Sequence, residues 1–149
     1  MNIILDRPIK SIMTENLMTV GKDIIMTEVA AIFNDYNFHH IPVLDEDNRP
    51  LGMISKSDFH QLQHHFTHLE LPDANEQNQK FFGSLLASEI MVDDLVCLTV
   101  DDSISDAVDI FLKNKIHSIL ICKDDECVGI VTPYDIIKSL VEPALMSKQ

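Results

Sequence analysis

Two short stretches of this chain carry the same polar side chains at the same spacing. Residues 52–58 read GMISKSD, and residues 129–135 read GIVTPYD. In both, a glycine and two apolar residues precede a hydroxyl side chain, and an aspartate follows three residues after that hydroxyl. A hydroxyl and an acid at this spacing cap the N-terminus of a helix. They could equally hold a sugar, because a carboxylate accepts hydrogen bonds from both hydroxyls of a ribose.

Helix capping explains part of this pattern. Residues 103–106, SISD, have the same spacing at the start of another predicted helix, and Pro133 follows Thr132 where a first helical residue is expected. Capping does not explain Gly52 and Gly129, because glycine within a strand often marks the close approach of a ligand or another backbone. A helix N-terminus also offers free N–H groups and a positive dipole end to a phosphate. The residues alone leave both interpretations open.

The two stretches close two copies of one repeat. IMTENL from Ile12 matches IMVDDL from Ile90, and at the same offset His39 matches His117. Each copy covers roughly 55 residues, which is small for an independent core, so we expect the copies to pack together and share one. We place the first repeat at residues 8–68, a polar linker at 69–86 and the second repeat at 87–146.

Each repeat is predicted to fold as β-α-β-β-α, which gives an α/β protein of the α+β type. A short turn between the last two strands implies that they pair antiparallel. The first repeat has predicted strands at 17–20, 40–44 and 50–54, a helix with Met26, Val29, Phe33 and Tyr36 on one face, and a helix from Ser55. The second has strands at 95–98, 118–122 and 127–131, a helix with Ile104, Ala107, Val108 and Phe111 on one face, and a helix from Thr132.

Composition excludes several classes of function. The 149 residues hold 24 acids against 11 lysines and arginines, and the formal net charge of −13 repels nucleic-acid backbones. No apolar run is long enough to span a bilayer, and the start lacks the apolar region of a signal peptide, so we expect no membrane partner and a cytoplasmic protein. The odd number of cysteines argues against a disulfide framework. Cys97 and Cys122 lie in apolar runs, where we expect them to be buried.

The histidines of HQLQHHFTH are a second candidate site. His60, His64 and His68 follow one another at every fourth residue and so share a helix face. Two of them could chelate a metal ion, but a third lies too far along the helix, and no acid or cysteine lies at ligand spacing. We therefore predict no metal site. The chain has no GxSxG motif and no P-loop, and we expect no catalysis.

On these residues the chain resembles a tandem CBS domain pair, also called a Bateman module. The resemblance rests on HHIPVLDED running into GMISKSD and on IHSILICKDD running into GIVTPYD, and it extends over nearly the whole chain outside the linker and termini. It implies two repeats packed by pseudo-twofold symmetry, often as a homodimer. Many such pairs bind adenine nucleotides or other adenosyl ligands in the clefts between repeats. They regulate an attached or partner protein and are not enzymes themselves.

The resemblance also implies roles for individual residues. The motif aspartates Asp58 and Asp135 would bind the ribose hydroxyls, and the hydroxyls of Ser55 and Thr132 would hold ribose or phosphate. The family places a basic residue beside the phosphates, where this chain has histidines, and an apolar segment beside the base. These further ligand-binding residues are His39, His40, His117, Met13 and Met91.

The second repeat departs from the family pattern. Leu120 stands where the first repeat has Pro42, and Ser118 stands where it has His40. The second site therefore carries less positive charge, and we expect the two sites to bind unequally.

The sequence thus predicts a regulatory module that senses an adenosyl ligand and passes a conformational change to a partner protein or across its own homodimer. AMP, ADP, ATP, S-adenosylmethionine and NAD all fit this class, as a regulatory ligand and not as a catalytic cofactor. The alternative is a ligand-free dimerisation or protein-interaction scaffold, in which the motif residues are only helix caps.

Overall fold

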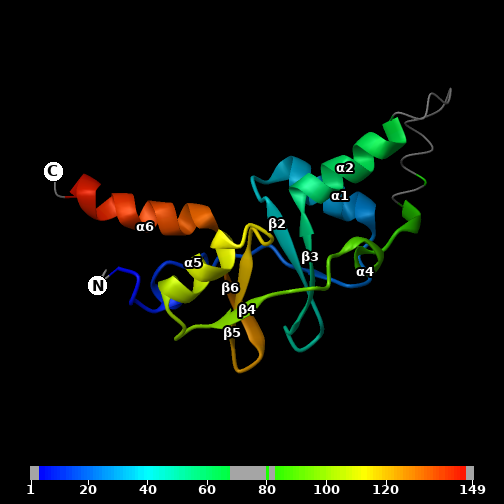
Figure 1. Ribbon diagram of the computed structural model, residues 1–149. Coiled ribbons are helices and arrows are strands. Elements are labelled where there is room, and N and C mark those ends of the chain that lie inside the picture. The colour runs from blue at the N-terminus through cyan, green and yellow to red at the C-terminus, as the bar shows by residue number, and fades with distance from the viewer. Residues whose placement is uncertain (1–3, 68–79, 81–82, 147–149) are drawn as a thin grey trace. The chain divides into compact units, whose positions relative to one another are not determined.

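The computed structural model describes residues 4–67, 80 and 83–146, and Figure 1 traces them. The chain forms two compact units, one of which spans Met18–Asp94. We call this the first-repeat unit. The second-repeat unit runs from Leu95 onward and also includes the chain up to Leu17. Among the described residues, no helix is long and apolar enough to cross a membrane.

The first-repeat unit is a small sheet covered by helices. Its strands lie in the order β1-β2-β3, with β1 parallel and β3 antiparallel to β2, as the short turn between β2 and β3 predicts. Its elements are β1 (Val20–Gly21), α1 (Met26–Asp35), β2 (His40–Leu44), β3 (Pro50–Ser55), α2 (Lys56–Thr67) and α4 (Ala87–Ile90).

The core of this unit follows from the apolar periodicity of its elements. Met26, Val29 and Phe33 recur along one face of α1 and are buried against the sheet. The ring of Phe33 lies 5.4 Å from the ring of Phe59 on α2. The prediction that Tyr36 shares this face is wrong. The helix ends at Asp35, the backbone of Tyr36 is extended, and its side chain is 53% exposed.

The second-repeat unit repeats this arrangement. Its strands lie in the order β4-β5-β6 with the same parallel and antiparallel pairings, and its buried core includes Ile104, Ala107 and Ile136 from the helices. Its elements are the 3-10 helix η1 (Ile9–Ser11), β4 (Cys97–Thr99), α5 (Ile104–Leu112), β5 (Ile119–Lys123), β6 (Glu126–Val131) and α6 (Pro133–Met146). The predicted α+β fold with two three-stranded sheets is therefore confirmed.

The two opening segments lie in units other than those of their own repeats. The segment that opens the first repeat pairs with the second-repeat unit, through bridges between Pro8 and Ser103 and between Thr14 and Ile130. The segment that opens the second repeat pairs with the first-repeat unit, through a bridge between Met53 and Val92. The repeat boundaries predicted from sequence follow the period of the motifs, whereas each compact unit combines parts of both repeats. Most of the predicted linker lies outside the described residues.

Candidate functional site

In the first-repeat unit, the motif lies where β3 passes into α2. Ser55 is the last residue of β3, and its Oγ accepts a hydrogen bond of 3.0 Å from the backbone N–H of Asp58. The Asp58 side chain is exposed, and within the described part of the chain its carboxylate accepts no hydrogen bond. Ser55 therefore caps the helix with its hydroxyl and leaves the neighbouring carboxylate available.

Both predicted histidines of the first repeat lie at the end of the sheet where β3 passes into α2. His40 is the strand partner of Ser55, and the carbonyl oxygen of His39 accepts a 2.8 Å hydrogen bond from the N–H of Lys56. His39 is exposed and His40 is half-buried. The backbone of His39 and His40 thus lies beside the helix N-terminus that carries Asp58. Side chains alternate along a strand, so at most one of the two imidazoles faces the motif. One imidazole, a free carboxylate and a helix N-terminus are a suitable set for a phosphorylated sugar.

In the second-repeat unit, the motif carboxylate is occupied by its own chain. Oδ2 of Asp135 accepts hydrogen bonds from the N–H of Thr132 at 2.9 Å and from the Thr132 hydroxyl at 3.3 Å. Oδ1 of Asp135 accepts a hydrogen bond of 3.1 Å from the hydroxyl of Thr14. A carboxylate oxygen offers about two acceptor sites, so a ligand at Oδ1 would share that oxygen with Thr14 or displace it. His117, the predicted basic residue here, is exposed two residues before β5, at the same end of the sheet.

The complete capping box at the start of α5 shows which hydrogen bonds of the two motifs helix capping explains. In the predicted cap at the start of α5, Ser103 Oγ accepts from the N–H of Asp106 at 3.1 Å, and Asp106 Oδ2 accepts from the N–H of Ser103 at 2.9 Å. Each motif makes only half of this reciprocal box. Ser55 supplies the hydroxyl half, and Asp135 supplies the carboxylate half. Each motif therefore caps its helix in part, and capping does not account for the side-chain carboxylate of Asp58.

The motif glycines are explained by methionines of the same chain. A Cβ built on Gly52 would lie 2.6 Å from Cγ and 2.9 Å from Cβ of Met91. A Cβ on Gly129 would lie 2.7 Å from Sδ of Met13 and 3.2 Å from the carbonyl oxygen of Thr14. Both glycines thus admit a methionine from an opening segment, and they give no support to a ligand. The sequence argument that linked these strand glycines to a ligand needs this correction.

The same packing places the predicted base-flanking residues at the motifs. Met53 and Val92 exchange two backbone hydrogen bonds of 2.9 Å, which hold Met91 against Gly52. Thr14 and Ile130 exchange bonds of 2.9 and 3.0 Å, which hold Met13 against Gly129. Both methionines are half-buried. Their role towards a base remains a prediction, since the packing itself accounts for their position.

Sequence reasoning did not identify Thr14 as a functional candidate. Its partner position in the repeat is Val92, which has no hydroxyl, so the repeat pattern gave no signal. This difference distinguishes the two sites. The hydroxyl of Thr14 donates a hydrogen bond to the Asp135 carboxylate, whereas Val92 at the equivalent position has no such donor.

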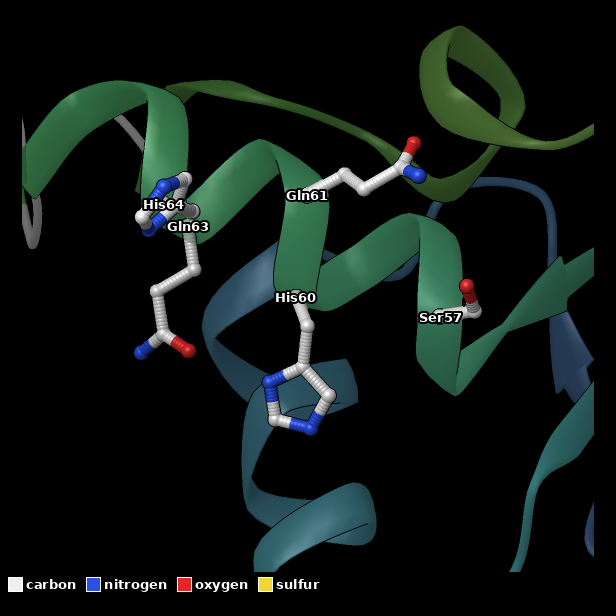
Figure 2. Close-up of a pocket in the computed structure, with 5 residues that line it drawn as sticks. All are labelled: Ser57, His60, Gln61, Gln63 and His64. Atoms are coloured by element: carbon white, nitrogen blue, oxygen red, sulfur yellow. The ribbon is translucent and has the colours of Figure 1, made fainter.

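The structure describes two of the three histidines that are predicted to share a helix face, and both lie on α2. His60 and His64 line a shallow hollow together with Ser57, Gln61 and Gln63, and Figure 2 shows their rings pointing in different directions. His68 lies outside the described residues. Within the residues that the structure places, no three histidine, cysteine, aspartate or glutamate side chains are arranged to hold a metal ion.

Comparison with known proteins identifies the repeat. The sequence model of the CBS domain matches residues 9–64 and again residues 87–142. The uncharacterized protein MJ1404 of Methanocaldococcus jannaschii is 27% identical over 146 residues, which cover 94% of this chain and 33% of that protein. The chain spans 33%, 22% and 44% of the lengths of three curated relatives that it matches, and so less than half of each.

Solved structures share the fold. The CBS domain of a CBS domain containing membrane protein from Sphaerobacter thermophilus is 27% identical with a TM-score of 0.74, over 91% of this chain and 88% of that chain. The CBS domain pair of protein MJ0100, solved in complex with 5′-methylthioadenosine and S-adenosyl-L-methionine, is 23% identical with a TM-score of 0.69. That match covers 91% of this chain and 97% of the other.

Proposed function

Because the chain belongs to the CBS domain family and carries two tandem copies of that domain, we propose that it is a regulatory module that binds an adenosyl ligand at its motif sites. The observation that carries this proposal is the exposed carboxylate of Asp58, which accepts no hydrogen bond in the described structure although it stands at a helix N-terminus. A ribose would supply the missing donors. The adenosyl ligands bound by the CBS pair of MJ0100 support the same ligand class.

The first-repeat site is the better candidate for the primary site. It combines the free carboxylate of Asp58 with His39 and His40, whereas the second site has His117 alone and a carboxylate already bonded to Thr14. We expect AMP, ADP, ATP, S-adenosylmethionine or NAD to occupy the first site at lower concentration than the second.

The second site offers a route from ligand to conformational change. A ribose that binds Asp135 competes with the hydroxyl of Thr14 for Oδ1. Thr14 belongs to an opening segment, so its release would weaken the attachment of that segment to β6. Ligand binding would then shift the population between attached and released segments, and an unidentified partner protein would respond to the difference.

Calorimetric titration of the full chain tests this proposal. The protein, shown to be free of co-purified nucleotide, is titrated separately with AMP, ATP, S-adenosylmethionine and NAD. We expect saturable heat with at least one of them. Absence of heat with all four, from folded protein, would contradict the proposal and favour a ligand-free interaction scaffold.

We also propose that the module forms a homodimer through α6. This helix exposes an apolar stripe in which Tyr134 is 68%, Ile137 58%, Leu140 45% and Val141 46% accessible. On α2 the repeat places Ser57, His60, Gln63 and His64 at the equivalent positions, so that face is polar. Two copies of α6 packed antiparallel would cover the stripe. The pair formed by Lys138 and Glu142 at 3.5 Å within one helix could then re-form between the two copies.

Replacing Ile137 with glutamate is expected to convert the dimer into a monomer, because a charge would be buried at the centre of the contact. Light scattering after size-exclusion chromatography measures the mass. His60→Glu, at the equivalent exposed position of α2, is the matched control and should leave the dimer intact. A parent chain that is monomeric, or a dimer that His60→Glu disrupts and Ile137→Glu does not, would contradict the α6 interface.

A further inference from the structure

The three cysteines of the chain gather on one sheet of the second-repeat unit. Cys122 on β5 is the direct strand partner of Cys127 on β6, and Cys97 lies on the neighbouring strand β4. The expectation that Cys97 and Cys122 are buried is wrong for Cys97, which is exposed, whereas Cys122 and Cys127 are half-buried. None of the three takes part in the motif site.

The turn between β5 and β6 sets the geometry of the cysteine pair. Asp124 and Asp125 have φ values of 52° and 67°, which is typical of a two-residue type I′ turn. Lys123 and Glu126 close this turn, and Cys122 with Cys127 is the next pair along the ladder. Antiparallel pairs alternate between hydrogen-bonded and non-hydrogen-bonded, and a pair that closes such a turn is hydrogen-bonded. The cysteines therefore occupy a non-hydrogen-bonded pair, for which the Cα atoms of a regular ladder lie roughly 4.5 Å apart. The ladder shifts register directly beyond this pair, between Ile121 and Cys122.

That separation falls within the Cα range of about 4.4–6.8 Å seen in disulfides. We propose that Cys122 and Cys127 form a reversible cross-strand disulfide when the protein meets a low-molecular-weight disulfide such as oxidised glutathione. One cysteine thiolate attacks the oxidant, forms a mixed disulfide and expels one thiolate of the oxidant. The second cysteine thiolate attacks the protein sulfur of that mixed disulfide and expels the other. The oxidant is reduced to two thiols, and the two cysteine sulfurs become bonded.

The ionisation of the thiols sets the expected rate. Partial burial of the thiol group raises the pKa of all three cysteines, including Cys97, whose residue as a whole is exposed. The pKa of Cys122 is raised to about 12, first by burial and then by ionised Cys97 and Cys127. A hydrogen bond with Cys122 partly offsets the rise in the pKa of Cys97. Because the thiolate is the attacking species, exchange is slow at neutral pH and accelerates about tenfold per pH unit. A dithiol that is not stabilised as thiolate also favours the oxidised state.

The disulfide would act close to the second motif. The Cys127 thiol donates a 3.8 Å hydrogen bond to the carbonyl oxygen of Gly129, the glycine against which Met13 packs. Oxidation removes this donor and fixes β6 two residues before that glycine. In a reducing compartment we expect the pair to be held as thiols and to close only where a disulfide oxidant is present.

Peptide mapping tests the proposal directly, because trypsin separates the three cysteines. Cleavage after lysine yields residues 81–113 with Cys97, 116–123 with Cys122 and 124–138 with Cys127. The full chain is incubated with oxidised glutathione, free thiols are alkylated, and the digest is analysed by mass spectrometry. We expect peptide 116–123 linked to peptide 124–138, with a yield that rises with pH and a link that dithiothreitol removes.

Variants distinguish the pair from the third thiol. Cys97→Ser should keep the linked peptide, and Cys127→Ser should lose it, with circular dichroism used to show that both variants are folded. Three fully alkylated cysteines in the oxidised parent, glutathione adducts without a link, or a link that always includes residues 81–113 would each overturn the proposal. These readouts do not require the protein to bind an adenosyl ligand.

Discussion

The variant Asp58→Ala is expected to bind an adenosyl ligand more weakly at the first-repeat site while keeping its fold. The Asp58 carboxylate accepts no hydrogen bond in the described structure, and the bond that Asp58 does make, from its N–H to Ser55 Oγ, survives the substitution. A hydrogen bond to a charged group contributes about 1.5–3 kcal/mol, so losing the ribose contact should weaken binding by roughly tenfold or more. Calorimetric titration and thermal unfolding measure the two effects side by side.

Two further variants serve as controls for this experiment. Asp106→Ala removes the carboxylate of a complete capping box outside both motifs, so it should cost about 1 kcal/mol of stability and leave binding unchanged. Asp135→Ala loses the bonds from Thr132 and Thr14, so it should destabilise the fold as well as affect the second site. Binding by Asp58→Ala equal to that of the parent would show that the ribose role is wrong. An equal loss in Asp106→Ala would attribute the effect to stability.

The variant Gly52→Ala is expected to destabilise the first-repeat unit by about 1–3 kcal/mol, the range for overpacking a filled core. A Cβ at this position would lie 2.9 Å from Cβ of Met91, which cannot move without its backbone. That backbone is held by the two hydrogen bonds between Met53 and Val92. Denaturant unfolding of the parent and the variant measures the difference in the free energy of unfolding.

A double-mutant cycle shows whether the contact with Met91 is the cause. Met91→Ala removes the clashing atoms beyond Cβ, so Gly52→Ala should cost less in that background. Gly21→Ala is the matched control, since Gly21 is a strand glycine with nothing within 4 Å of a built Cβ, and it should change stability by no more than about 0.5 kcal/mol. An equal cost in both Met91 backgrounds would refute the packing explanation.

Most elements of the fold could be predicted from the sequence because their signals are local. The opening strands are the exception, since the predicted strands at 17–20 and 95–98 overlap β1 (Val20–Gly21) at one residue and β4 (Cys97–Thr99) at two. The apolar run of β2 begins at His40 as predicted, and α6 begins directly after Thr132. The error at Tyr36 arises because the apolar residues keep helical spacing in the sequence beyond Asp35, where the helix ends. The error at Cys97 arose because an apolar run does not say which face of a thin sheet is covered.

Only the features of the site that the two repeats share could be predicted from the sequence. The hydroxyl and the aspartate of each motif are recognised from the sequence alone. The hydrogen bonds that distinguish Asp58 from Asp135 depend on a segment that is distant in the chain. That segment contributes Thr14 to one unit and Val92 to the other. No local pattern states that an opening segment pairs with the strands of the other repeat, because both repeats offer equivalent strands.

The exchange of opening segments has a consequence for how the chain folds during synthesis. All the residues of the first-repeat unit, Met18–Asp94, are available once residue 94 has left the ribosome. The second-repeat unit must wait, because η1 and its neighbours are tied to residues near Asp102, for example by the 2.6 Å bond from Ile9 to its carbonyl oxygen. Such contacts between distant parts of the chain close large loops and slow folding. Residues that emerge before the first-repeat unit are thus among the last to find their partners, and a fragment that begins at the second repeat would lack Ile9, which is part of the core of the second-repeat unit.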